Sequence, residues 1–282
     1  MAGVSAKELK GRIRSMESTR QITKAMEMVA ASKLRPAQEK VLHSRPYFET
    51  LYATMADLAG CRPDYPSVYT TPGKGNRACF VVIAGDRGLA GGYNSNVLKT
   101  VWEQMKELDS VALPLGRKAV EFFRSRGVSL MTEDYTEAAG VSVGDCFAMA
   151  RLLCQGFRRG EFDRVYLGYT NFVSLLSQSP AVLELLPLRP VEPQKQEPGR
   201  PILYEPDSES VYDAIVPEYL GGLIYGALCE SVASEQAARR TAMDAATKNA
   251  DEMIDDLNLK FNRARQGAIT QEITEIVAGS EA

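Results

Sequence analysis

The two ends of the chain carry helical periodicity over lengths that no compact domain of this size can contain. In residues 5–59, apolar side chains recur at spacings of three and four. The first two groups are Leu9, Ile13 and Met16, and then Ile22, Met26 and Val29. Residues 207–279 have the same character around an Ala-rich centre. A stripe this narrow is typical of a coiled-coil seam, and the two helices would be roughly 80 Å and roughly 110 Å long.

Two prolines interrupt the first periodic segment. Pro36 should remove one main-chain hydrogen bond and bend the helix, and Pro46 follows ten residues later. One helix that runs through both prolines is the favoured interpretation. The alternative is a helix that ends near residue 34 and a second helix that begins after it. At the other end of the chain, Asp207 is placed to cap the last helix.

Between the two helical ends, strand-like and helix-like segments alternate. Strands are expected at 78–84, 111–115 and 164–170, with a further extended segment at 177–188, and helices at 94–108, 117–127 and 143–158. This alternation predicts a small α/β sheet covered by helices. The proline-rich residues 191–206 predict a linker or loop.

The lengths of the helices constrain how they run. A domain of this size is only about 35–40 Å across, so both helices must project from it. The first helix ends at the domain and the last begins there, which makes them antiparallel. The last helix then extends past its partner by about 25 Å. This tail, residues 262–282, keeps an apolar stripe of Ile269, Ile273, Ile276 and Val277. A stripe without a partner inside the chain predicts a larger assembly.

Composition excludes several classes of function. The chain has a single histidine, His43, which leaves almost no room for a His-based metal site or for Ser–His catalysis. The five cysteines form no C-x-x-C pair, and Cys146 and Cys154 would lie about 12 Å apart on one helix, too far to bridge. A reducing, cytoplasmic setting is expected. No run of 18 apolar residues exists, so no membrane span is expected.

Positive charge is concentrated near the N-terminus. Residues 1–45 hold ten Lys or Arg and four Asp or Glu. One interpretation is a solvated helix face. The other is a basic rod that meets an acidic partner, either protein or nucleic acid. The segment has no aromatic residue for base stacking, which disfavours nucleic acid.

Four motifs resemble the γ subunit of F-type ATP synthases in its bacterial form. The two long ones are "RIRSMESTRQITKAMEMVAASKLRPAQ" and "SEQAARRTAMDAATKNADEMIDDLNLKFNRARQGAITQEITEIV", and the short ones are "DRGLAGGYN" and "LYEPD". The resemblance implies an α/β fold with a long antiparallel coiled coil of the N- and C-terminal helices and a central Rossmann-like α/β domain. The implied domains are the N-terminal coiled-coil helix at 1–60, the Rossmann-like foot at 61–206 and the C-terminal coiled-coil helix at 207–282.

The resemblance also implies a function without catalytic residues or a cofactor in this chain. In the family, the foot sits on the membrane ring of c subunits and the coiled coil enters a hexamer of α and β subunits. Ion-driven rotation then changes the conformation of catalytic sites on β. The implied partners are the α, β and ε subunits and the ring, with no nucleic acid. The implied location is peripheral, on the cytoplasmic face of the cell membrane.

Motif positions carry the family's contact residues over to this chain. The residues expected to contact the α/β hexamer are Lys24, Met26, Lys33, Arg239, Arg265, Gln266, Thr270, Ile273 and Ile276. Tyr204 and Glu205 are expected to contact the membrane ring. For each residue, the alternative is packing in the seam or a place on a solvated face. Pro36 stands where family members usually carry a basic or small residue, which puts the local contacts in question. The closely spaced cysteine pair inserted in the plant chloroplast form is missing here, so we expect no thiol regulation of that kind.

A glycine-rich loop raises the question of nucleotide binding. Its glycines stand at 85, 88, 91 and 92, which matches neither the dinucleotide fingerprint nor the P-loop. We expect no nucleotide there, and glycines that serve tight turns and close packing against the coiled coil or a small neighbouring subunit. A nucleotide-dependent enzyme and a coiled-coil tether without rotation are the competing hypotheses.

Overall fold

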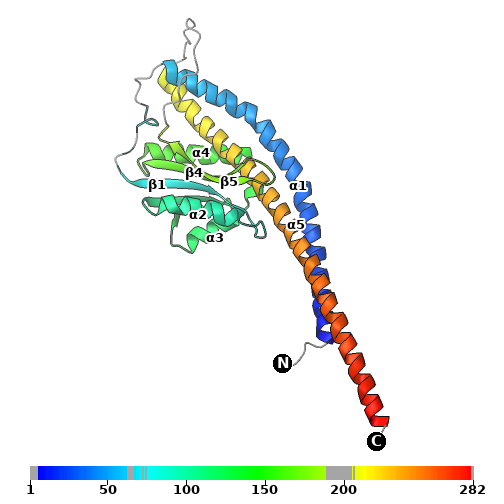
Figure 1. Ribbon diagram of the computed structural model, residues 1–282. Helices are drawn as coiled ribbons and strands as arrows, with labels where there is room; N and C mark the ends of the chain where they lie inside the picture. The colour runs from blue at the N-terminus through cyan, green and yellow to red at the C-terminus, as the bar shows by residue number, and fades with distance from the viewer. Residues whose placement is uncertain are drawn as a thin grey trace. The chain divides into compact units, whose positions relative to one another are not determined.

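The computed structural model describes residues 6–61, 67–71, 73, 75–188, 205 and 207–280. The chain divides into two compact units. The helical unit combines Met1–Ala31 with Arg239–Ala282, and the α/β unit is Ser32–Ala238. Two long helices, α1 (Ala6–Cys61) and α5 (Ser208–Ser280), each contribute to both units (Figure 1).

Helix α1 is continuous through Pro36 and Pro46, so the alternative of two separate helices is wrong. Pro36 lies on the exposed face of the helix, where water can bond to a carbonyl group that the proline leaves without a donor. The opposite face buries Leu34, Ala37 and Val41. Burial of this face stabilises the helix more than one missing hydrogen bond weakens it.

Helix α5 begins where the sequence predicts. The main-chain N–H of Ser210 donates to Asp207 Oδ1 at 2.8 Å, which confirms the expected N-terminal cap. The helix passes through Pro217 and ends at Ser280, one residue beyond the predicted end.

The α/β unit contains a five-stranded sheet in the order β3-β2-β1-β4-β5. The strands are β1 (Arg77–Ile83), β2 (Asp109–Leu115), β3 (Ser129–Leu130), β4 (Arg164–Phe172) and β5 (Gln178–Leu186). Pairing is parallel except between β4 and β5, which are antiparallel. The expected strands are confirmed. The two-residue strand β3 is an addition that the sequence did not predict.

Helices cover both faces of this sheet. They are α2 (Tyr93–Met105), α3 (Arg117–Arg124) and α4 (Val143–Arg158). Alternate residues of β1 face opposite ways: Phe80 and Val82 pack with α2 and α3, while Val81 and Ile83 pack with α4 and the first part of α5. A central parallel strand buried on both faces explains the continuous apolar run "ACFVVI".

Helix α5 is also fastened to the end of β4 by hydrogen bonds. The N–H of Thr170 donates to Ser231 Oγ at 3.1 Å, and Ser234 Oγ donates to the carbonyl oxygen of Thr170 at 3.3 Å. The partner of Thr170 on β5 is Pro180, which has no N–H, and the pairing of β4 with β1 ends at Gly168. The two serines therefore supply bonds that neighbouring strands do not supply.

Replacing these serines should cost more than replacing the threonine. Ser231→Ala leaves the buried N–H of Thr170 without its acceptor, so we expect a loss of about 1–3 kcal/mol in the free energy of unfolding. Within the described residues Thr170 Oγ1 is buried without a hydrogen-bond partner, so Thr170→Val should be neutral or stabilising. Urea unfolding of the purified chain measures both. An equal loss in the two variants would contradict this account.

Candidate functional site

In the helical unit, α1 and α5 pack side by side in opposite directions. Arg20 Nη1 lies 3.2 Å from Asp251 Oδ1, and the hydroxyls of Thr23 and Thr247 are 2.8 Å apart. Partner numbers fall along α5 as they rise along α1. The expected antiparallel coiled coil is confirmed.

The seam between these helices follows a seven-residue repeat. Its positions are Leu9, Met16, Thr23 and Ala30 on α1, and Met243, Ala250, Leu257 and Ala264 on α5. All are buried except Met16 and Ala264, which are half-buried. Small residues such as Ala30 and Ala250 let the helices approach closely.

The sequence pattern assigned the wrong residues to the middle of this seam. Ile22 and Val29, expected to face α5, are 58% and 55% exposed, and the adjacent Thr23 and Ala30 are buried in their place. The reason is that the buried positions there are polar or small, so the larger apolar neighbours dominate the pattern. Ile22 and Val29, seven residues apart, share an outward face of α1, and Met28 beside them in the sequence is 60% exposed.

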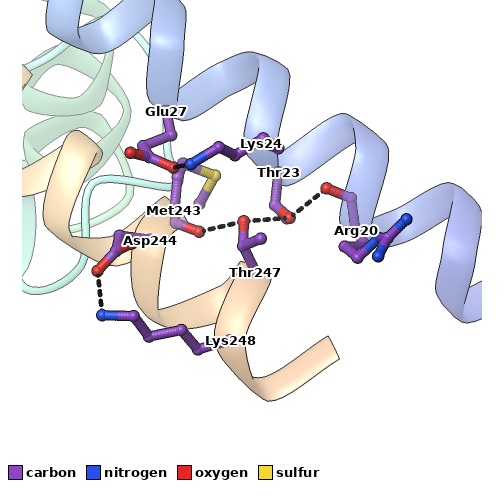
Figure 2. Close-up of polar contacts among 8 residues, drawn as sticks. All are labelled: Arg20, Thr23, Lys24, Glu27, Met243, Asp244, Thr247 and Lys248. Carbon is purple, nitrogen blue, oxygen red and sulfur yellow. Dashed lines mark hydrogen bonds and ion pairs between the residues drawn. The ribbon is translucent and has the colours of Figure 1, made fainter. Parts of the chain in front are cut away.

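A polar layer crosses the seam at Thr23 and Thr247 (Figure 2). Thr247 Oγ1 also lies 2.8 Å from the carbonyl oxygen of Met243, and Thr23 Oγ1 lies 3.0 Å from that of Arg20. The two hydroxyl hydrogens can make only two of these three hydrogen bonds at a time. In either arrangement each hydroxyl donates one hydrogen bond, so both side chains are satisfied. A buried polar pair of this kind favours one register between two helices.

The surface around the expected contact residues of α1 is balanced in charge. Lys24 Nζ lies 2.9 Å from Glu27 Oε2, and this hydrogen bond and negative charge raise the pKa of Lys24. On α5, Lys248 pairs with Asp244 at 2.8 Å, which raises the pKa of the lysine and lowers that of the aspartate (Figure 2). The local positive charge expected at Lys24 is therefore largely paired. Met26 is half-buried.

The last turns of α5 extend beyond the paired part of the seam. Residues 265–277 are all exposed. The apolar stripe expected there is confirmed as exposed, with Ile269 at 47%, Ile273 at 57%, Ile276 at 71% and Val277 at 52%. The hydroxyl of Thr270 donates to the carbonyl oxygen of Gln266 at 2.9 Å. That hydroxyl is satisfied within the helix, so it adds no free hydrogen-bonding group beside the apolar stripe.

The other expected contact residues are placed as follows. Lys33, Arg265 and Gln266 are exposed and Arg239 is half-buried. Glu205 is exposed, whereas Tyr204 lies outside the described residues. The structure thus groups Arg265, Gln266, Thr270, Ile273 and Ile276 on one exposed stretch of α5.

The glycine loop packs against the chain's own last helix. The backbone is left-handed at Leu89 (φ 62°) and Gly91 (φ 56°), and Gly85 N–H donates to Asn94 Oδ1 at 2.8 Å. A Cβ atom at Gly85 would lie 2.8 Å from Oε1 of Glu235 on α5. The expected tight turn and close packing are confirmed at these positions. Asp86 in this loop accepts a hydrogen bond from the N–H of Ala138 at 2.9 Å, so its carboxylate serves the fold.

The described residues contain neither an activated thiol among the three most buried cysteines nor a cluster of metal ligands. Cys79, Cys146 and Cys154 are buried and free, and burial raises the pKa of each to about 12. No group of three or more potential ligands among the described side chains is placed to hold a metal ion. No helix in the described part of the chain has the length and apolar character needed to cross a membrane.

The fold resembles chains of known rotary assemblies. A chain titled as central stalk and c-ring of the Tetrahymena thermophila mitochondrial ATP synthase is 25% identical, with a TM-score of 0.61 over 80% of this chain and 99% of that chain. A chain from the rotor of the Euglena gracilis mitochondrial ATP synthase has a TM-score of 0.65 at 20% identity, over 94% of this chain and 98% of that chain. The architecture is therefore shared with ATP synthase stalk and rotor chains.

Sequence comparison identifies the family. A family model described as ATP synthase matches residues 5–282. The ATP synthase gamma chain of Ruminococcus albus is 45% identical over 279 residues, 97% of each chain, and that of Alkaliphilus metalliredigens is 41% identical over 286 residues, 99% of each chain. The chain belongs to the ATP synthase gamma chain family.

Seam and tail residues should differ in their effect on stability. Ile273→Ser should change the free energy of unfolding of the purified chain by no more than about 0.5 kcal/mol, because its side chain is exposed. Leu257→Ala removes a buried seam side chain on the same helix and should cost about 2–5 kcal/mol. Urea unfolding compares the two. Equal losses would mean that the tail stripe is covered within the chain.

The buried cysteines should resist alkylation in the folded chain. Raised thiol pKa values mean that the folded state holds its protons more tightly than the unfolded state. This contribution to stability is full below the ordinary pKa of 9.0 and declines as the pH rises toward about 12. Iodoacetamide at pH 8 should label Cys79, Cys146 and Cys154 only after urea is added, as measured by peptide mass spectrometry. Rapid labelling without urea would show that these thiols are accessible.

Proposed function

We propose that this chain is the central-stalk subunit of an F-type ATP synthase. It transmits torque between an ion-driven membrane ring and the catalytic α/β hexamer, and carries no catalytic site itself. The observation that carries this proposal is the exposed apolar stripe at the end of α5 in a chain of the gamma family. Such a stripe in water marks a surface that a partner covers.

The hexamer is the proposed partner of the helical unit. The exposed apolar residues Ile22, Met28 and Val29 lie in the same two turns of α1 as the expected contact residues Lys24 and Met26. The charged side chains of Lys24 and Glu27 on this surface are already paired within the chain. They would therefore not fix the chain in one orientation against one partner, which suits a surface that contacts several partners in turn. Lys33 and Arg239 extend the same proposed contact set, and Arg265, Gln266, Thr270, Ile273 and Ile276 form its tail.

The remaining assignments belong to the same proposal. The N-terminal helix domain is 1–60, the α/β foot is 61–206 and the C-terminal helix domain is 207–282. Tyr204 and Glu205 contact the membrane ring, and the ε subunit is a further partner. The chain is peripheral on the cytoplasmic face of the cell membrane, as its similarity to bacterial gamma chains supports.

An affinity pull-down tests this function. The tagged chain is recovered from gently solubilised native membranes, and complex mass, subunit stoichiometry and ATPase activity are measured together. A single copy with several copies of two larger subunits and ATP turnover is the expected result. If the chain is recovered alone, or as a small homo-oligomer that binds nucleotide, the proposal is overturned. The favoured hypothesis is then a nucleotide-dependent enzyme that uses the glycine loop. If truncation of the tail lowers recovery of the complex but leaves the ATP turnover of each recovered complex unchanged, a coiled-coil tether without rotation is indicated.

Removing the end of the tail should weaken assembly without abolishing catalysis. A chain truncated after Gln271 loses Ile273 and Ile276 but no residue that is expected to take part in catalysis. We expect several-fold lower recovery of the complex, and ATP turnover that is reduced but still measurable in the complex that remains. Gel filtration followed by ATPase assay of the recovered fraction measures both. Total loss of turnover in an intact complex would contradict the non-catalytic role.

A further inference from the structure

Buried polar side chains of the α/β unit are concentrated where α5 leaves the sheet. Thr170, Ser231, Ser234 and Glu235 are all buried, at 6% exposure or less. Among the described residues of this unit, the only other buried polar side chain is Ser67. We call the four residues, together with Gly85, the α5 joint.

The joint presents one face of α5 to two parts of the domain. Ser234 and Glu235 follow Ser231 by three and four residues, so both lie on the same side of the helix as Ser231. The serines bond both main-chain groups of Thr170 at the end of β4. Glu235 faces the glycine loop, where Gly85 leaves room for its carboxylate. The same helix face thus contacts a strand end and a loop.

The other contacts between α5 and the domain include a buried apolar core and two exposed ion pairs, Arg151 with Glu218 and Arg158 with Asp213. The preceding turns of α5 bury Val216, Leu220 and Ile224 in the core shared with α4. Apolar contacts resist separation but have no directional preference. Hydrogen bonds weaken steeply when their angle changes. Of the buried contacts between described residues of α5 and the sheet, the hydrogen bonds at the joint respond most directly to rotation of the helix about its own axis.

The position of the joint along the chain gives this resistance a role. Glu235 lies only a few residues before Arg239, where the α5 part of the helical unit begins. Any torque that passes between the α/β domain and the helical unit through α5 crosses this point. A rigid attachment at this point prevents α5 from rotating about its own axis relative to the α/β domain.

We propose that the α5 joint is the torque-bearing attachment of the α/β domain to the rod, with Ser231, Ser234 and Glu235 as its positioning residues. This inference rests on the proposed function. It assigns the joint a mechanical role beyond the stability that its hydrogen bonds contribute. Weakening the joint should soften the rotor in torsion while the hexamer continues to hydrolyse ATP.

Single-molecule rotation tests this role in the whole complex. The hexamer is immobilised and a bead is attached to the α/β domain of this chain. Torsional stiffness is obtained from angular fluctuations of the bead in the stalled complex, and rotation speed is recorded with ATP. The test variants are Ser231→Ala/Ser234→Ala and, independently, Gly85→Ala, whose new methyl group would displace the Glu235 carboxylate.

The matched control is Val97→Ala. Val97 is fully buried in the core on the opposite face of the sheet, where α2 packs. It should lower the melting temperature of the chain without touching the joint. Melting curves of all variants show whether each chain folds and how much stability it loses.

We expect the angular variance to rise roughly twofold or more in both joint variants, because the serine variant loses two directional bonds and the glycine variant displaces the Glu235 carboxylate. The variance should stay at the wild-type value in Val97→Ala. Wild-type variance in the folded joint variants would overturn the inference, and so would an equal rise in Val97→Ala. If the wild-type chain neither binds the hexamer nor rotates, the proposed function fails and this inference fails with it. Rotation of the wild type with unchanged stiffness in the variants overturns the inference alone.

Discussion

The burial of one face of α5 is the interaction on which the rest of the structure depends. Most of the stability of a helix in a protein comes from the packing of one face, and α5 has 73 residues to pack. In the α/β unit its apolar residues complete the core beneath the sheet, and in the helical unit Met243, Ala250 and Leu257 close the seam with α1. Where this burial stops, near residue 265, the helix continues with its apolar side chains in water.

The two ends of α5 contact their surroundings in opposite ways. At Ser231, Ser234 and Glu235 the contacts are polar, buried and directional. At Ile273 and Ile276 the surface is apolar, exposed and without angular preference. A subunit that must be held firmly by its own domain and turn freely within its partners needs both kinds of contact.

Periodicity in the sequence was sufficient to predict the two long helices, their antiparallel direction, the strands of the sheet and the exposed tail. It failed where small or polar residues take buried positions, as at Thr23 and Ala30, because Ile22 and Val29 beside them carry the stronger apolar signal. It also missed the α5 joint. The need for Ser234 at Thr170 arises from strand register, which places Pro180 opposite, and register is not visible in the sequence. Of the expected contact residues, those in the tail are exposed as expected, and the pairing of Lys24 with Glu27 could not be read from the sequence.

The exposed stripe at residues 265–277 has a consequence for the cell as well as for the complex. A chain made in excess of its partners displays a row of isoleucines to water, and such surfaces associate with one another or with chaperones and proteases. Supply of this subunit must therefore match the supply of the subunits that cover the stripe. The abundance of the subunit is then limited by its own exposed stripe, because each copy without partners is open to aggregation and proteolysis.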